Sequence, residues 1–259
     1  MGSARGLVTG DLVRDAEARR QRYAEPFAAH ALLDRTIAEV YHANRKKLRV
    51  RTMPEEVCAF LFGKATKTLD AIRGLCESGF GQDAVILTRS LVNPVINVWY
   101  IGGDPQERTK DYIAAGRKVR RDYLERFPGR PGPLPALDAD WEEVKQRAKR
   151  WNDVNIEMRA KGSPLDDVYR EVYRYGSSLD HSDSWSGNQY VGPRDGETFV
   201  INNGPSDDLV GIALGSALQV MILLMEVLYR AFGITDRERL DALLAEFKQL
   251  TNFKGQTSA

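Results

Sequence analysis

The segment from Asp83 to Ile101 constrains the fold more than any other part of the chain. Its apolar side chains recur at helical spacing and cover roughly 200° of a helical wheel, more than half of the circumference. A helix with so wide an apolar surface must be covered on several sides by other elements. The segment therefore predicts a central helix in a multi-helix assembly. We expect Pro94 to kink this helix near Ser90, because proline removes one main-chain hydrogen bond.

Helix-forming residues dominate most of the remaining chain, and glycine or proline residues separate the segments. We expect one small exception at residues 189–202, where two short apolar runs flank Asp195-Gly196. This pattern favours a β-hairpin, with an ordered loop as the alternative. The predicted fold class is therefore all-α, a multi-helix bundle with that small hairpin. The expected helices span residues 11–24, 27–48, 54–79, 83–101, 106–127, 138–160, 164–180, 206–232 and 236–250.

Two of these helices carry recognisable start signals. Thr52 precedes Pro54, and a threonine cap followed by a proline in the first turn is typical of a helix N-terminus. The polar run at 206–208 is expected to cap the long apolar helix that follows it.

A proline- and glycine-rich run at residues 128–135 is the only strong linker signal in the chain. The length of 259 residues allows one large domain or two ordinary ones. We interpret residues 1–259 as a single helical domain, with 128–135 as the only candidate internal boundary.

Composition excludes several classes of function. The 37 basic residues balance 36 acidic ones, so bulk charge gives no reason to expect a polyanionic partner, although local basic clusters occur. Two cysteines exclude a disulfide framework, and three histidines cannot build a histidine-rich metal site. We predict no cofactor and no metal ion.

The N-terminal residues lack the sustained apolar stretch of a secretory signal, so a cytoplasmic location is expected. The segment from Leu209 to Met225 is apolar enough to suggest a membrane span. Ser216 and Gln219 interrupt it, and no basic flank sets a topology. We therefore predict a core helix of a soluble protein and no membrane association.

A polar arc runs along the central helix. Arg89, Asn93 and Asn97 are spaced by four residues and stack one turn apart, and Tyr100 shares the arc. The arc is either the solvent edge of a buried helix or the wall of a polar pocket, because helical period alone cannot separate the two.

A second group lies on the helix expected at residues 164–180. Tyr173, Ser177 and His181 recur every four residues, and His181 falls near the helix C-terminus, where the helix dipole favours an imidazolium. A surface or capping histidine is the alternative. Arg174 shares a face with His181, about 10.5 Å away along the axis, so a phosphate fits between them. Such a pair supplies a proton-transfer group and a cation for an anionic phosphorus centre.

This pair resembles the motif of the HEPN ribonuclease superfamily, in which an arginine is followed within four to six residues by a histidine near the end of an all-helical bundle. Tyr175 stands here where that family often has a polar residue. The chain from Cys58 to His181 also resembles a set of uncharacterised bacterial helical proteins. Members usually carry Glu at the position of Asn93, and the resemblance implies a fold and a site location. The matching residues are Arg89-Ser90-Leu91, Asn93, Asn97, Tyr100, Tyr173, Ser177 and His181.

Two hypotheses follow for the function. In the first, a polar cleft between the two helices binds an anion or an RNA phosphate. Its enzymatic form is a metal-independent ribonuclease with His181 and Arg174 as catalytic residues. The other class is a non-catalytic interaction module of a defence or toxin–antitoxin system. The partners left open are RNA, a small anion and a second copy of the chain. The candidate binding residues are Arg89, Asn93, Asn97, Tyr100, Tyr173 and Ser177.

Overall fold

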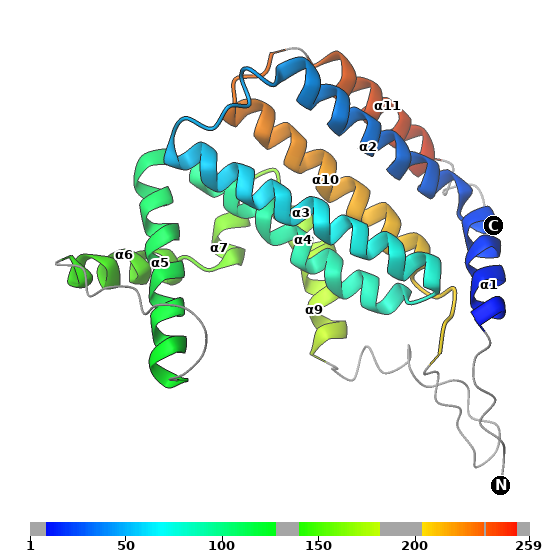
Figure 1. The fold of residues 1–259 in the computed structure, drawn as a ribbon, viewed down its shortest axis with the longest axis horizontal. Helices are drawn as coiled ribbons and strands as arrows, with labels where there is room; N and C mark the ends of the chain where they lie inside the picture. The colour runs from blue at the N-terminus through cyan, green and yellow to red at the C-terminus, as the bar shows by residue number, and fades with distance from the viewer. Residues whose placement is uncertain (1–8, 128–139, 182–203, 236, 253–259) are drawn as a thin grey trace, which may run out of the picture.

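The computed structural model describes residues 9–127, 140–181, 204–235 and 237–252, and helices make up most of them (Figure 1). This confirms the predicted all-α multi-helix class. The expected hairpin at 189–202 and the run at 128–135 lie outside the described residues. The helices are α1 Thr9–Arg22, α2 Ala24–Asn44, α3 Met53–Ser78, α4 Gly81–Gly102, α5 Pro105–Arg126, α6 Trp141–Asp153, α7 Ile156–Ala160, α8 Asp166–Val168, a π-helical segment at Tyr169–Tyr173, α9 Arg174–Asp180, α10 Val210–Ala231 and α11 Glu238–Asn252.

The centre of the molecule is a layer formed by α3, α4 and α10, which lie side by side in Figure 1. Helix α4 packs against both of its neighbours, as its wide apolar surface predicts. Helices α2 and α11 cover the outer side of α10. Fully buried side chains come from all three central helices, among them Leu69, Ile72, Leu91, Ile96, Leu214, Met221 and Leu224.

The start of α3 has the predicted cap. The Thr52 hydroxyl accepts a hydrogen bond from the Glu55 N–H, and the Glu55 carboxylate accepts one from the Thr52 N–H. Two main-chain donors at the helix start are thus satisfied reciprocally, which defines a capping box. The helix ends at Gly79, whose φ of 82° is the left-handed conformation that glycine adopts at low cost.

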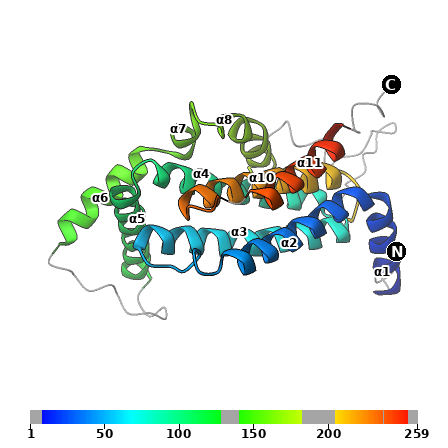
Figure 2. The ribbon, with the colours of Figure 1, turned by 90° about the horizontal axis from the view of Figure 1, so that it is seen from above.

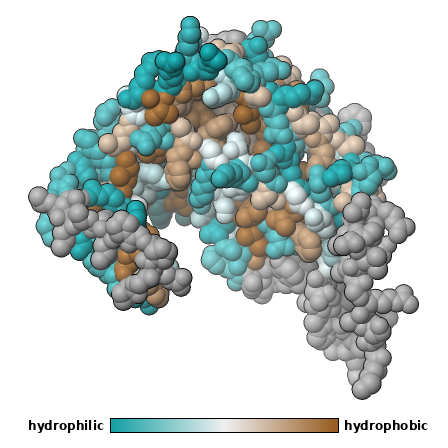
Figure 3. Space-filling view, in the orientation of Figure 1, coloured by the Kyte–Doolittle hydropathy of each residue, from teal (hydrophilic) through white to brown (hydrophobic). Residues whose placement is uncertain are grey.

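Helices α5 and α6 form an arm that projects from the central layer (Figures 1 and 2). They pack mainly on each other, through the buried side chains of Val144 and Ala148 and through ion pairs of Arg147 and Arg150 with Asp111. In the space-filling view a notch separates the arm from the body (Figure 3). Among the described residues, α5 contacts α3 and α4, and Trp151 near the end of α6 contacts Tyr100 of α4.

Three of the predicted helices differ in detail from the structure. The helix expected at 138–160 is interrupted after Asp153, because the Asn155 side chain caps a new helix, α7, by accepting a hydrogen bond from the Met158 N–H. The helix expected at 164–180 contains a π-helical segment. The long apolar helix begins at Val210, and the cap predicted at residues 206–208 is not formed, because no side chain caps the start of α10.

The residues before α10 are held by tertiary contacts. Arg19 and Arg22 of α1 both form ion pairs with Asp207, and the Tyr23 hydroxyl donates to its carbonyl oxygen. Leu209 has a φ of 62°, which turns the chain into the helix. Asp207 therefore serves α1 and does not act as the helix cap that its residue type suggests.

By length and composition alone, α4 and α10 are both long enough and apolar enough to cross a membrane. More than half of each apolar stretch is buried against other helices in the fold, and the core helix of a soluble protein meets the same criteria. Helix α4 also continues through Pro94, which is buried.

Candidate functional site

Four of the residues singled out in the sequence line one open depression. Tyr173, Arg174, Ser177 and His181 surround a volume of about 710 Å³ on the outer side of the π-helical segment and α9. The rings of Tyr169 and Tyr173 stack here, with their centroids 5.0 Å apart. Arg174 and His181 are both exposed. The structure thus brings this predicted group together on a solvent-facing surface.

His181 occupies the C-terminal end of α9, where the sequence predicts it. Its main-chain N–H donates to the carbonyl oxygen of Ser177, which closes the last turn of the helix. His181 is exposed and lines the depression.

Arg89 lies behind this depression and does not line it. Its guanidinium forms an ion pair with Asp180 and lies over the Tyr173 ring, 5.0 Å from the centroid. Gly176 packs directly against it, so closely that an added Cβ would be 2.8 Å from the Arg89 Cβ. Helices α4 and α9 are therefore in contact at this point. The Arg89 charge is used to hold α9 on α4, and Asp180 already compensates it.

The other end of the polar arc faces a different part of the molecule. Asn97 accepts a hydrogen bond from Arg159 Nη1 at 2.8 Å, whereas Asn93 is half-buried between the two ends. Tyr100 lies under the guanidinium of Arg108, whose carbon is 4.0 Å from the ring centroid. Arg89 and Asn97 are eight residues apart, which corresponds to about 12 Å along a helix. The predicted binding residues are thus divided between two places.

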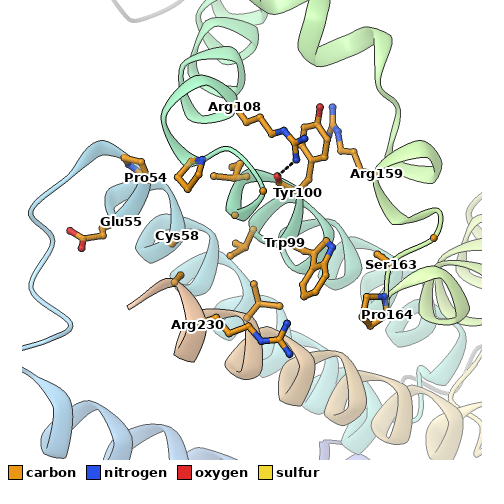
Figure 4. Close-up of a pocket in the computed structure, with 18 of the residues that line it drawn as sticks. Pro54, Glu55, Cys58, Trp99, Tyr100, Arg108, Arg159, Ser163, Pro164 and Arg230 are labelled. Atoms are coloured by element: carbon orange, nitrogen blue, oxygen red, sulfur yellow. Dashed lines mark hydrogen bonds between the residues drawn. The ribbon is translucent and has the colours of Figure 1, made fainter. Parts of the chain in front are cut away.

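A pocket of about 680 Å³ lies at this second place, at the C-terminal end of α4 (Figure 4). It is lined by residues from α3, α4, α5, α7 and α10 and from the connection between α7 and α8. We call it the arginine pocket, after three side chains that reach it from three different helices. Its principal residues are Trp99, Tyr100, Arg108, Arg159 and Arg230.

Each of the three arginines is held by neutral groups. Arg108 Nη1 donates to the carbonyl oxygen of Tyr100 at 2.6 Å. Arg159 donates to Asn97 and to the carbonyl oxygen of Trp151, and its guanidinium carbon lies 3.7 Å from the Trp151 ring centroid. Arg230 lies over the Trp99 ring at 5.3 Å. Carbonyl oxygens and aromatic rings orient the guanidiniums but do not neutralise them.

The electrostatic balance of the arginine pocket is strongly positive. Within the described part of the chain, none of its three arginines forms a salt bridge, and Lys161 adds a further cation to the lining. Glu55 is the one carboxylate among the lining residues, and it is used in the α3 cap. Main-chain hydrogen bonds, first from Arg51 and also from Thr52, lower the pKa of Glu55. A pocket with these contents attracts anions.

Burial lowers the pKa of Arg159 to about 10, because the charged guanidinium is partly removed from water. Its Nε is buried and has no hydrogen-bond partner. The side chain keeps its positive charge at neutral pH but lacks a counter-ion. A bound anion would supply both the missing charge and an acceptor.

The lining of the arginine pocket suits binding more than acid–base chemistry. No histidine is among the residues that line it. Burial raises the pKa of the Cys58 thiol to about 11, so no thiolate is available at neutral pH. The Ser163 hydroxyl donates to the carbonyl oxygen of Ala160 and accepts from the Leu165 N–H, which ties it to a local turn.

Sequence reasoning selected Tyr100, which lines this pocket, and Asn97, which bonds to Arg159, but it assigned both to a cleft with His181 and missed the arginines of the pocket. Arg108, Arg159 and Arg230 each lie in a separate charged segment and look like ordinary solvent-facing residues. Their convergence depends on how α5, α7 and α10 pack around the end of α4. No local spacing in the sequence carries that information.

The fold and its pocket define an all-helical protein with a concave, cation-lined site. A family model, described as a family of unknown function (DUF5677), matches residues 55–198. The chain belongs to this family. The match runs from α3 past α9 and includes Arg108 and Arg159, whereas Arg230 lies beyond it. Neither the curated proteins nor the solved structures contain a match to this chain.

Proposed function

We propose that the protein binds a small anionic ligand in the arginine pocket. The observation that carries this proposal is the convergence of Arg108, Arg159 and Arg230 on one concave volume without a salt-bridge partner among the described residues. Guanidinium groups offer several donors in one plane, a geometry that matches phosphate and carboxylate oxygens.

The surrounding chain makes the lack of counter-ions notable. Other half-buried arginines, such as Arg73 and Arg147, are paired: Arg73 with Asp34 and Asp70, and Arg147 with Glu107 and Asp111. The chain as a whole is nearly neutral, with a formal net charge of +1. The positive charge of the pocket is therefore a local feature, and a local anion is the simplest complement to it.

Titration calorimetry with inorganic phosphate and pyrophosphate tests this function. We expect saturable binding by the full chain and an affinity at least about tenfold lower in Arg108→Gln, because a charge-assisted hydrogen bond contributes about 1.5 to 3 kcal/mol. Arg108 is half-buried and donates to the Tyr100 carbonyl oxygen, to which a glutamine amide can also donate, so its replacement should leave the fold intact. Arg120→Gln, at an exposed position of α5, is the matched control and should bind like the wild type. Absence of binding in the wild type would remove the proposal.

We also propose a second function, the metal-independent cleavage of RNA at the depression formed by the π-helical segment and α9. The specific support is that Arg174 and His181 are exposed on one surface beside the stacked rings of Tyr169 and Tyr173. His181 would transfer a proton and Arg174 would stabilise the phosphorus centre, as in the HEPN resemblance. A homodimer would place two such surfaces together.

RNA incubated with the protein and a chelator tests the catalytic form. We expect cleavage by the wild type and its loss in His181→Ala, with His42→Ala as a matched exposed control. A folded wild type that leaves RNA intact would leave the alternative class, a non-catalytic interaction module of a defence or toxin–antitoxin system. For either function we propose a cytoplasmic protein whose α4 and α10 are core helices. Recovery in the detergent-free supernatant after ultracentrifugation would agree with this.

A further inference from the structure

The arginine pocket is larger than a simple anion requires. Its volume of about 680 Å³ lies within the range of about 300 to 1,000 Å³ that is usual for sites of small organic ligands. Between and around the arginines the lining is largely apolar. It includes Val98, Ile101, Pro105, Val227 and Ala231. A phosphate ion alone would leave most of this apolar surface uncovered.

The cations stand at two ends of the pocket, with an aromatic side chain between them. In Figure 4, Arg108 and Arg159 flank Tyr100 at one end, whereas Arg230 lies beside Trp99 at the other. Arg159 approaches Tyr100 as well, with its guanidinium carbon 5.5 Å from the ring centroid. Two guanidiniums at one end match a dianion better than a single negative charge. A phosphate monoester carries about −1.5 to −2 at pH 7, whereas a carboxylate carries −1.

Trp99 is available for stacking. It is half-buried in the pocket wall. The Arg230 guanidinium carbon lies 5.3 Å from its ring centroid, which is a looser contact than the 3.7 Å between the Arg159 guanidinium carbon and the Trp151 centroid. A planar ring inserted between Trp99 and Arg230 needs about 7 Å, two layers of roughly 3.5 Å. Arg230 is exposed, so a side-chain movement of about 2 Å would make this room.

We infer that the anion bound in the arginine pocket is the phosphate group of a small molecule that also carries a planar ring. This inference rests on the proposed anion binding. The ring lies against Trp99 beneath Arg230, and the phosphate lies at the other end of the pocket, beside Arg108 and Arg159. Nucleoside monophosphates belong to this chemical class, and adenosine 5′-monophosphate is the probe for it.

Calorimetric titration of the full chain with four compounds tests the inference. The compounds are adenosine 5′-monophosphate, ribose 5-phosphate, inorganic phosphate and adenosine. We expect the nucleotide to bind about 10- to 100-fold more tightly than ribose 5-phosphate, because stacking of a base on an aromatic side chain contributes about 1 to 3 kcal/mol. In Trp99→Leu this preference should disappear while phosphate affinity is retained. Trp99→Phe should keep most of it, and Trp141→Phe, in the arm, should behave like the wild type.

The outcomes separate this inference from the function on which it rests. Equal affinity of the wild type for the nucleotide and for ribose 5-phosphate would contradict the proposed ring contact with Trp99 but would leave the proposed anion binding in place. Equal affinity for adenosine and for the nucleotide would contradict the proposed contribution of the phosphate group to binding. No binding of any phosphate compound overturns both proposals. The wild-type titrations decide the matter even if Trp99→Leu does not fold.

Discussion

Single residues in this fold have environments that determine their charge, and His30 of α2 is an example. Its side chain is 1% exposed, and its Nε2–H donates to the carbonyl oxygen of Leu214 in α10 at 2.9 Å. Burial lowers the pKa of His30 below its ordinary value, because the imidazolium would lose its hydration. The folded state therefore favours neutral His30.

This arrangement predicts a loss of stability in mild acid. The unfolded chain takes up a proton on His30 near its ordinary pKa of about 6.5, whereas the folded chain resists protonation. The free energy of unfolding should therefore be highest above that pH and fall below it, by at most about 1.4 kcal/mol per pH unit from this group. Urea unfolding at several pH values measures the slope. His30→Gln should flatten it, whereas His42→Gln, on the exposed part of the same helix, should not.

Single residues also show how much of the candidate site the sequence can predict. Helical period correctly places Asn97 and Tyr100 on one polar arc, and it places Arg174 and His181 on one surface. It cannot say which cations are compensated. Arg89 is neutralised by Asp180, ninety-one positions away, while Arg230 has no such partner among the described residues. Charge pairing between distant segments is a property of the folded chain alone.

At the scale of elements, contact between α4 and α9 depends on a missing side chain. Gly176 lies on the face of α9 that meets α4, and an added Cβ would lie 2.8 Å from the Arg89 Cβ and 3.0 Å from the Val85 carbonyl oxygen. Neither atom is the end of a flexible side chain. The two helices would have to move apart to admit a methyl group.

Gly176→Ala should therefore destabilise the protein by about 1 to 3 kcal/mol, the usual cost of overpacking. The same substitution at Gly116, in the middle of α5, has nothing within 4 Å to meet. Because glycine is a poor helix former, Gly116→Ala should stabilise the protein by up to about 1 kcal/mol. Thermal unfolding of both variants measures the contrast. Changes of the same sign would contradict the proposed contact.

Most helices could be predicted from the sequence, and the exceptions share a cause. Proline and glycine mark the ends of α3, and the Thr52 cap is present as expected. Asp207 looks like a helix cap by residue type, but it pairs with Arg19 and Arg22 instead. The π-helical segment before α9 leaves no local signature either. Elements are mispredicted where distant contacts compete with local preference.

At the scale of the whole molecule, the arm of α5 and α6 is joined to the body by an aromatic cluster. The Trp151 ring makes edge contacts with Tyr100 and Tyr112, at centroid distances of 5.7 and 5.0 Å. Arg159 covers the same ring and bonds to the Trp151 carbonyl oxygen. The arm buries little apolar surface beyond this joint, whereas α4 and α10 are enclosed on several sides.

Hydrogen exchange should therefore distinguish the arm from the body. We expect amides of α6 to exchange faster than those of α4 and α10, because local opening is easiest where few buried contacts are lost. Arg159→Gln should increase exchange in α6 and leave α10 unchanged. Mass spectrometry of peptic fragments measures both. Equal protection of α6 and α10 in the wild type would show that the arm opens only with the whole fold.

The shared position of Arg159 has a thermodynamic consequence. One guanidinium both fastens the arm and lines the pocket, so a ligand that fixes it in place also holds the arm more firmly. Coupling between two binding events is reciprocal. A second molecule that binds the arm in the position seen here would therefore raise the affinity for the ligand by the same factor by which the ligand raises the affinity for that molecule. A molecule that pulls the arm away would release the ligand. Ligand binding in the pocket and the position of the arm would then be thermodynamically coupled through Arg159.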